Sequence, residues 1–219
     1  EQSWLVSGDL TLSDDSDSWL DKKILELPRE RIRAVETLHP DMEEVFVARP
    51  TKDLEQFEVH NIPEGSELKY EAVAAGMGSA LQYLNFVDVQ PLTDFEAPEE
   101  TPVETTFWTF DGLRVDVSIY TVEEKPYATF AVSPGGDGPE RLATTGPPAP
   151  AEVGPEPADA AEAPEEEPGR TDEEIAAEVD ELNAQVSGWV YELAVYNKSN
   201  LSKRMEDLIQ PIVVEEEAP

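Results

Sequence analysis

A stretch rich in Pro, Gly, Ala and Glu divides this chain and limits how much of it can fold. Residues 134–170 hold nine of the 19 prolines and six of the 12 glycines, and they contain no aromatic residue. Such a stretch buries too little apolar surface to offset the entropy that ordering it would cost. We therefore expect a disordered, extended linker at 134–170, between foldable segments at 1–133 and 171–219.

The negative charge lies mostly outside this linker. The chain has 49 acidic and 15 basic residues and a formal charge of −34, of which −7 belongs to 134–170, −18 to 1–133 and −9 to 171–219. Nucleic-acid binding requires clustered Lys and Arg, so this charge argues against it, and it also argues against docking on an anionic membrane surface. The chain has no Cys, which excludes disulfides and Cys-based metal sites.

The pattern between residues 105 and 132 is typical of an antiparallel sheet. Residues 107–110 and 113–119 flank Asp111-Gly112, a pair that favours a tight hairpin turn. Apolar and polar residues alternate along 113–119, and residues 127–132 complete a three-stranded meander. Further strands are expected at 3–10, 31–38, 45–48, 57–59 and 86–89.

Helices are expected in four places. Apolar residues recur at helical spacing over 69–85, where Gly76 and Gly78 indicate close packing against a sheet, and over 175–189, which follows the capping box Thr171-Asp172-Glu173-Glu174. A short helix is expected over 19–25, and a last helix around 201–209 ends at Pro211. Residues 189–193 look extended.

Together these patterns predict an α+β fold. Antiparallel sheet would occupy most of residues 1–133, with one or two packed helices, and the C-terminal segment 171–219 would return to cap it, because its apolar helix face needs a partner. No run is long enough to span a membrane, and no signal peptide is present. The chain opens on Glu1-Gln2 directly before a strand pattern, so we expect it to be a fragment of a longer protein.

No catalytic or cofactor motif emerges from the residues. His39 and His60 lack metal-ligand spacing and are expected to be ordinary surface or edge histidines. No serine-nucleophile motif is present, and Gly76-Met77-Gly78 lacks the third glycine and the strand of a phosphate-binding loop. We therefore predict no catalytic, cofactor-binding or metal-ligating residues. A carboxylate-based hydrolase has no support beyond the abundance of acids.

Two clusters have alternative interpretations. Asp14, Asp15, Asp17 and Asp21 could bind a hard cation, but they lack the central Gly and terminal Glu of an EF-hand, so helix capping is favoured. The four tryptophans could form a sugar platform, but each occupies an apolar position in a separate element, so core packing is favoured. They are Trp4, Trp19, Trp108 and Trp189.

Several short packing and turn motifs lie along the chain outside the linker. They are SWLVSGDL (3–10), WLD (19–21), LPxxRI (27–32), HPD (39–41), IPEGSEL (62–68), TFDGL (109–113), WVYEL (189–193) and LxxRMEDL (201–208). These motifs resemble a bacterial family known as domain of unknown function 4340, in its alphaproteobacterial branch. The resemblance covers nearly all of the chain outside the linker.

This resemblance implies a periplasmic protein held in the inner membrane by one N-terminal helix and built of repeated α+β units. Residues 1–133 would be the end of one unit and most of a second. Members are often encoded beside ABC-transporter components of the gliding-motility type, and the family has no established catalytic residues. Residues 1–219 include neither the anchor nor the first unit of this pattern, and we expect their linker to be an expanded form of a short connection.

The resulting expectation is a non-enzymatic periplasmic interaction domain, accessory to an ABC-type envelope transport complex. Its partners would be transporter subunits or other envelope proteins, with no cofactor. The alternative is an acidic module that binds a cation or another ligand.

Overall fold

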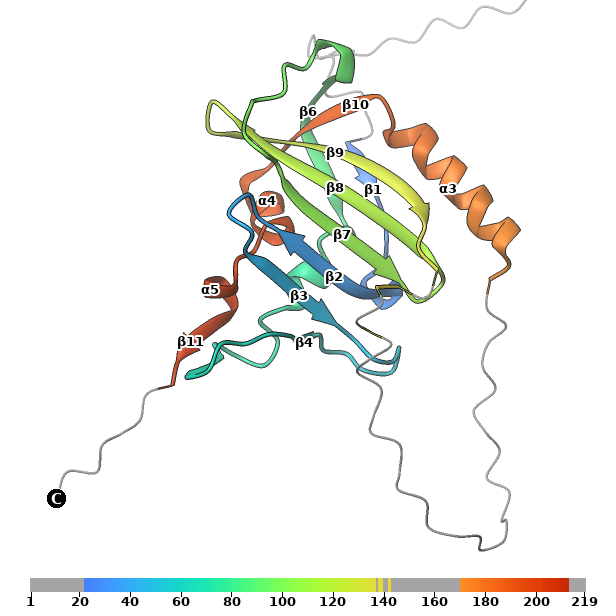
Figure 1. Ribbon diagram of the computed structural model, residues 1–219. Helices are drawn as coiled ribbons and strands as arrows, with labels where there is room; N and C mark the ends of the chain where they lie inside the picture. The colour runs from blue at the N-terminus through green and yellow to red at the C-terminus, as the bar shows by residue number, and fades with distance from the viewer. Residues whose placement is uncertain (1–21, 137, 140–141, 143–169, 213–219) are drawn as a thin grey trace, which may run out of the picture.

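One antiparallel sheet organises the molecule. The structure, a computed structural model, describes residues 22–136, 138–139, 142 and 170–212. Nine strands follow the order β1-β6-β10-β9-β8-β7-β2-β3-β4, and every neighbouring pair is antiparallel. The sheet is strongly curved, so that β1 and β6 lie behind β7, β8 and β9 in Figure 1. With its packed helices it forms the predicted α+β fold.

The strands of this sheet vary from two to ten residues. They are β1 (Lys23–Leu25), β2 (Ile32–Leu38), β3 (Glu44–Ala48), β4 (Glu58–Val59), β6 (Leu84–Pro91), β7 (Val103–Thr109), β8 (Leu113–Val122), β9 (Lys125–Pro134) and β10 (Trp189–Leu193). A separate two-stranded sheet pairs β5 (Ser66–Leu68) with β11 (Ile209–Pro211). The helices are α1 (Ala75–Gly78), α3 (Asp172–Val186), α4 (Val195–Leu201) and α5 (Met205–Leu208), with 3-10 turns at Arg29–Arg31 and Leu92–Asp94.

The predicted meander is confirmed. Asp111-Gly112 lies in the turn between β7 and β8, and Gly112 has a φ of +87°, which favours glycine. Along β8 the side chains of Leu113, Val115, Val117 and Ile119 are buried in the core, while Arg114 is exposed. This alternation places one face of the sheet on the core and the other toward solvent.

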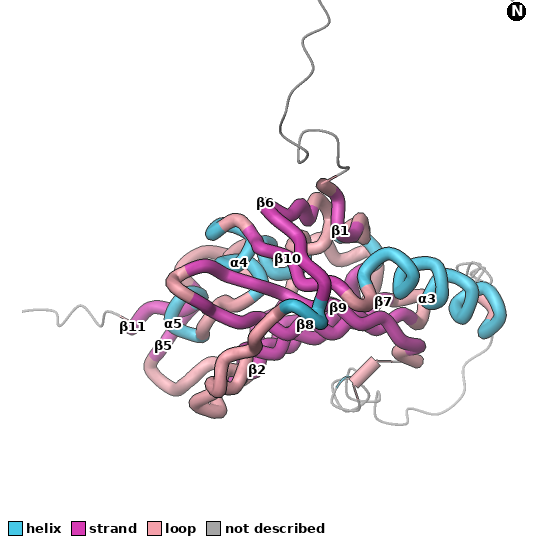
Figure 2. The backbone as a smooth tube through the Cα atoms, turned by 90° about the horizontal axis from the view of Figure 1, so that it is seen from above, coloured by secondary structure: helices cyan, strands magenta, loops and turns pink. Residues whose placement is uncertain are grey.

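The C-terminal segment supplies a central strand as well as helices. β10 pairs with β6 on one side and with β9 on the other, at Tyr191↔Ala128 and Glu192↔Tyr127. α3 packs beside β9, and Figure 2 shows α3 at one end of the sheet and α4 with α5 at the other. Helices from residues 171–212 therefore cap the sheet as expected.

Three local predictions are wrong. Residues 23–25 form strand β1, where a helix was expected over 19–25. The expected helix over 69–85 is reduced to the four residues of α1, with turns on both sides. The last expected helix, around 201–209, is replaced by the end of α4, by α5 and by strand β11.

The described part of the chain contains no helix with the length and apolar character needed to cross a membrane. Residues 143–169 of the expected linker, and the strand expected at 3–10, lie outside the described residues.

Candidate functional site

Both histidines make contacts that hold neighbouring parts of the fold together. His39 is buried, contrary to expectation, and its Nε2 lies 3.2 Å from the carbonyl oxygen of Lys203, so it links the β2–β3 turn to the C-terminal segment. His60 packs its ring against Phe46 with centroids 5.1 Å apart. Neither histidine belongs to a metal-ligating group among the described residues.

Gly76 and Gly78 do indicate close packing, although the neighbours are not a sheet. A Cβ on Gly78 would lie 2.1 Å from Cε2 of Phe57, and a Cβ on Gly76 would lie 2.8 Å from Oδ1 of Asn200. The Gly76-Met77-Gly78 segment therefore serves packing against Phe57 and α4.

The tryptophans have different environments. Trp108 is buried, but it belongs to a small cluster with Ala34, Phe46 and Ala48 that is separate from the main core. Trp189 is 42% exposed, so its assignment to the core was wrong. Trp4, Trp19 and the Asp14–Asp21 cluster lie outside the described residues.

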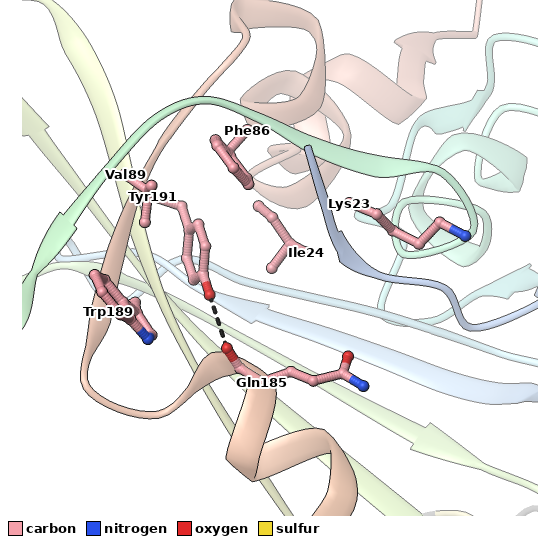
Figure 3. Close-up of a pocket in the computed structure, with 7 residues that line it drawn as sticks. All are labelled: Lys23, Ile24, Phe86, Val89, Gln185, Trp189 and Tyr191. Atoms are coloured by element: carbon pink, nitrogen blue, oxygen red, sulfur yellow. Dashed lines mark hydrogen bonds between the residues drawn. The ribbon is translucent and has the colours of Figure 1, made fainter. Parts of the chain in front are cut away.

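Trp189 forms one wall of a pocket of about 550 Å³ between three strands and the end of α3 (Figure 3). Its lining residues are Lys23 and Ile24 on β1, Phe86 and Val89 on β6, Gln185 on α3, and Trp189 and Tyr191 on β10. This volume lies within the usual range for sites that hold a small ligand.

The local sequence explains how the pocket forms. α3 ends at Val186, and Gly188 follows with a φ of +82°, which permits the sharp turn into β10. This turn brings Gln185 opposite Tyr191, whose hydroxyl donates to the Gln185 carbonyl oxygen at 3.2 Å. Burial raises the pKa of Tyr191, which keeps this hydroxyl protonated as a donor. Gly188 before Trp189 was the one signal of this turn in the sequence.

The pocket is aromatic and carries little charge. Tyr191 packs its ring against Phe86 at 5.6 Å and against Phe130 at 5.8 Å, so the wall is held in place by the core. None of the seven described residues that line it is acidic. The Lys23 side chain points away from the rings in Figure 3 and pairs with Glu26 at 2.5 Å. The pocket therefore suits an apolar group.

The edge of β6 beside the pocket is protected against strand addition. Among the described residues no strand pairs with β6 beyond Phe86 on the side of β1. The amide of Val89 donates to the Asp88 carboxylate at 2.8 Å, and Pro91, two residues on, has no N–H. A charged residue and a proline are common ways to blunt an exposed strand edge. An added strand would find few donors here.

A network of four charges holds α3 to the sheet. Arg31 contacts Asp111 at 2.7 Å and binds both carboxylate oxygens of Glu178, at 2.8 and 3.0 Å. Arg170, just before α3, contacts Asp111 at 3.3 Å and also binds Glu178. Burial acts to raise the pKa of both carboxyls, but hydrogen bonds and the arginine charges outweigh it and lower them. This network positions the helix that ends at the pocket.

No family model, curated protein or solved structure matches this chain. The pocket therefore has to be interpreted from its own geometry.

Proposed function

We propose that this chain is a non-enzymatic interaction domain of a membrane-anchored envelope protein, accessory to an ABC-type transport complex. In this proposal a partner protein inserts an apolar side chain into the pocket bounded by Trp189. The family resemblance motivates the periplasmic location and the class of partner.

The observation that carries the proposal is the partial exposure of Trp189. A large indole that is 42% exposed, beside the buried rings of Phe86 and Tyr191, leaves apolar area open to water. Partly exposed aromatic residues beside a preformed pocket are typical of interface anchors. Binding a partner side chain would remove this apolar area from water.

The test compares variants of the full-length protein purified from host membranes. Trp189→Ala removes the indole that forms one wall of the pocket. Gln185→Trp places a large side chain in the pocket and leaves intact the backbone carbonyl of residue 185, which accepts the hydrogen bond from the Tyr191 hydroxyl. Tyr83→Ala is the control, because Tyr83 is 70% exposed and does not line the pocket. We expect transporter subunits to co-purify with the wild type and with Tyr83→Ala, and at least about tenfold less with the two pocket variants, as for an aromatic hot spot.

Equal recovery of transporter subunits with all four proteins, or recovery with none, would remove the proposal. The alternative, a cation-binding module, predicts that millimolar calcium raises the melting temperature, because a ligand that binds only the folded state stabilises it.

A further inference from the structure

The exposed face of α3 leads to the pocket and carries uncompensated negative charge. Glu173, Asp180 and Glu181 are exposed and recur at helical spacing, and α3 contains no basic residue. Gln185, in the last turn of the same helix, lines the pocket. From Glu173 to Gln185 the helix rises about 18 Å, which is the length of a short peptide segment.

These carboxylates differ from Glu174 and Glu178 on the same helix. Glu174 completes the capping box with Thr171, and Glu178 binds Arg31 and Arg170. Glu173, Asp180 and Glu181 make no ion pair within the part of the chain that the structure describes. Because these three carboxylates neither cap α3 nor anchor it to the sheet, they are available to contact a partner.

The small side chains between these acids keep the face open. Ala177 and Ala184 are exposed on the same side of α3 as Glu173 and Asp180. A bound segment can therefore approach the helix closely along this face. Asp88 and Pro91 protect the β6 edge against strand addition. We therefore expect the bound segment to lie along α3 and not to pair with the sheet.

Building on the proposed function, we infer that the partner of this pocket is a cationic protein segment. One aromatic or branched aliphatic side chain enters the pocket, and Lys or Arg residues on the same segment lie along Glu173, Asp180 and Glu181. A second copy of this chain does not fit, because each copy carries a formal charge of −34. An anionic segment would be repelled in the same way.

The test uses amide NMR of the chain with two synthetic peptides. One has a single phenylalanine flanked by lysines, and the other has the same phenylalanine flanked by glutamates. We expect the lysine peptide to shift the amide signals of α3 and β10 and to bind at least about tenfold more tightly than the glutamate peptide at low salt. Added salt is expected to reduce this difference.

Two sets of variants separate the charged face from the pocket. Glu173→Gln/Asp180→Asn/Glu181→Gln is expected to weaken the lysine peptide several-fold, and Trp189→Ala about tenfold. The matched control is Glu58→Gln/Glu64→Gln/Glu71→Gln, which removes the same charge from exposed positions on β4 and in the loops after it. This control is expected to leave binding nearly unchanged.

Failure of this inference and failure of the proposed function give different results. If both peptides bind equally and Trp189→Ala weakens both, the partner is not selected by positive charge, and the inference is overturned while the pocket remains an interaction site. Equal weakening by the α3 triple variant and by its control would also overturn it, because net charge alone would then act. Equal recovery of transporter subunits with the wild type and the pocket variants, or recovery with none of them, would overturn the proposed function without testing the charge preference of the pocket.

Discussion

The side chain of Asn183 bonds both backbone groups of Val132. Its Oδ1 accepts the Val132 amide at 2.9 Å, and its Nδ2 donates to the Val132 carbonyl at 2.7 Å. Among the described residues β10 pairs with β9 at Tyr127 and Ala128, and α3 packs beside this edge farther along β9. One amide side chain thus satisfies a strand edge that would otherwise lack a partner at this position.

Replacing Asn183 is expected to loosen α3. Asn183→Leu removes two hydrogen bonds and leaves the Val132 groups beside an apolar side chain, so we expect a loss of about 1–3 kcal/mol in the free energy of unfolding. Urea denaturation measures this loss. Asn85→Leu, at an exposed position, is the control, and an Asn183→Leu variant as stable as that control would show that water replaces the amide at no cost.

Gly78→Ala is expected to destabilise the fold despite the better helix propensity of alanine. The new Cβ would meet the Phe57 ring, which is buried and lies 4.8 Å from the Arg49 guanidinium, so the ring cannot move freely. Overpacking of this kind costs about 1–3 kcal/mol. Gly76→Ala meets only the end of the Asn200 side chain and is expected to cost less.

A double variant that combines Gly78→Ala with Phe57→Ala tests this explanation. In the Phe57→Ala background Gly78→Ala should be neutral or stabilising, because the ring it would strike is absent. An unchanged penalty in that background would place the strain elsewhere.

The charge network predicts a loss of stability in acid. The folded-state pKa values of Asp111 and Glu178 are lowered, whereas unfolded carboxyls titrate at about 3.9 and 4.3. The unfolded state therefore takes up protons first as the pH falls, so the stabilisation is present above about pH 5 and is lost as the pH falls through the folded-state values.

Glu178→Gln is expected to lower the free energy of unfolding by about 2 kcal/mol at pH 7 and by less at pH 3. The measurement is urea denaturation across this pH range. A deficit of the same size at both pH values would mean that the carboxylate charge does not carry the effect.

Salt is expected to stabilise the protein as a whole. With a formal charge of −34, repulsion between carboxylates opposes compaction, and added salt screens it. The melting temperature should therefore rise between low and near-molar NaCl. A falling melting temperature would mean that the ion pairs of Arg31 and Arg170 outweigh this repulsion.

The sequence predicted elements whose signals are local. The Asp111-Gly112 turn, the alternation along β8 and the Thr171 capping box each depend on neighbouring residues, and each is present in the structure. The helix expected over 69–85 failed for a physical reason. Val73, Met77, Leu81 and Leu84 are indeed buried, but Gly76 and Gly78 are poor helix formers, and the segment makes only the short helix α1 with turns on both sides before β6 begins at Leu84. The apolar spacing therefore indicated correctly which side chains are buried, but it did not indicate a helical backbone.

The pocket could not be predicted, because it depends on contacts distant in sequence. Residues 189–193 were expected to be extended, but their position between β6 and β9 follows from pairing across the whole sheet. That position brings Trp189 and Tyr191 beside Ile24 and Phe86, and it leaves the indole partly exposed.

The most direct test of the pocket is site-specific photocrosslinking in host membranes. A photoreactive residue at position 185 of the full-length protein would lie at the pocket mouth, and one at position 83 would lie on an exposed site that does not line the pocket. We predict an adduct with a transporter subunit from position 185 that disappears when Trp189→Ala is added, and none from position 83. No adduct from position 185, or equal adducts from both positions, would contradict a partner bound at this pocket.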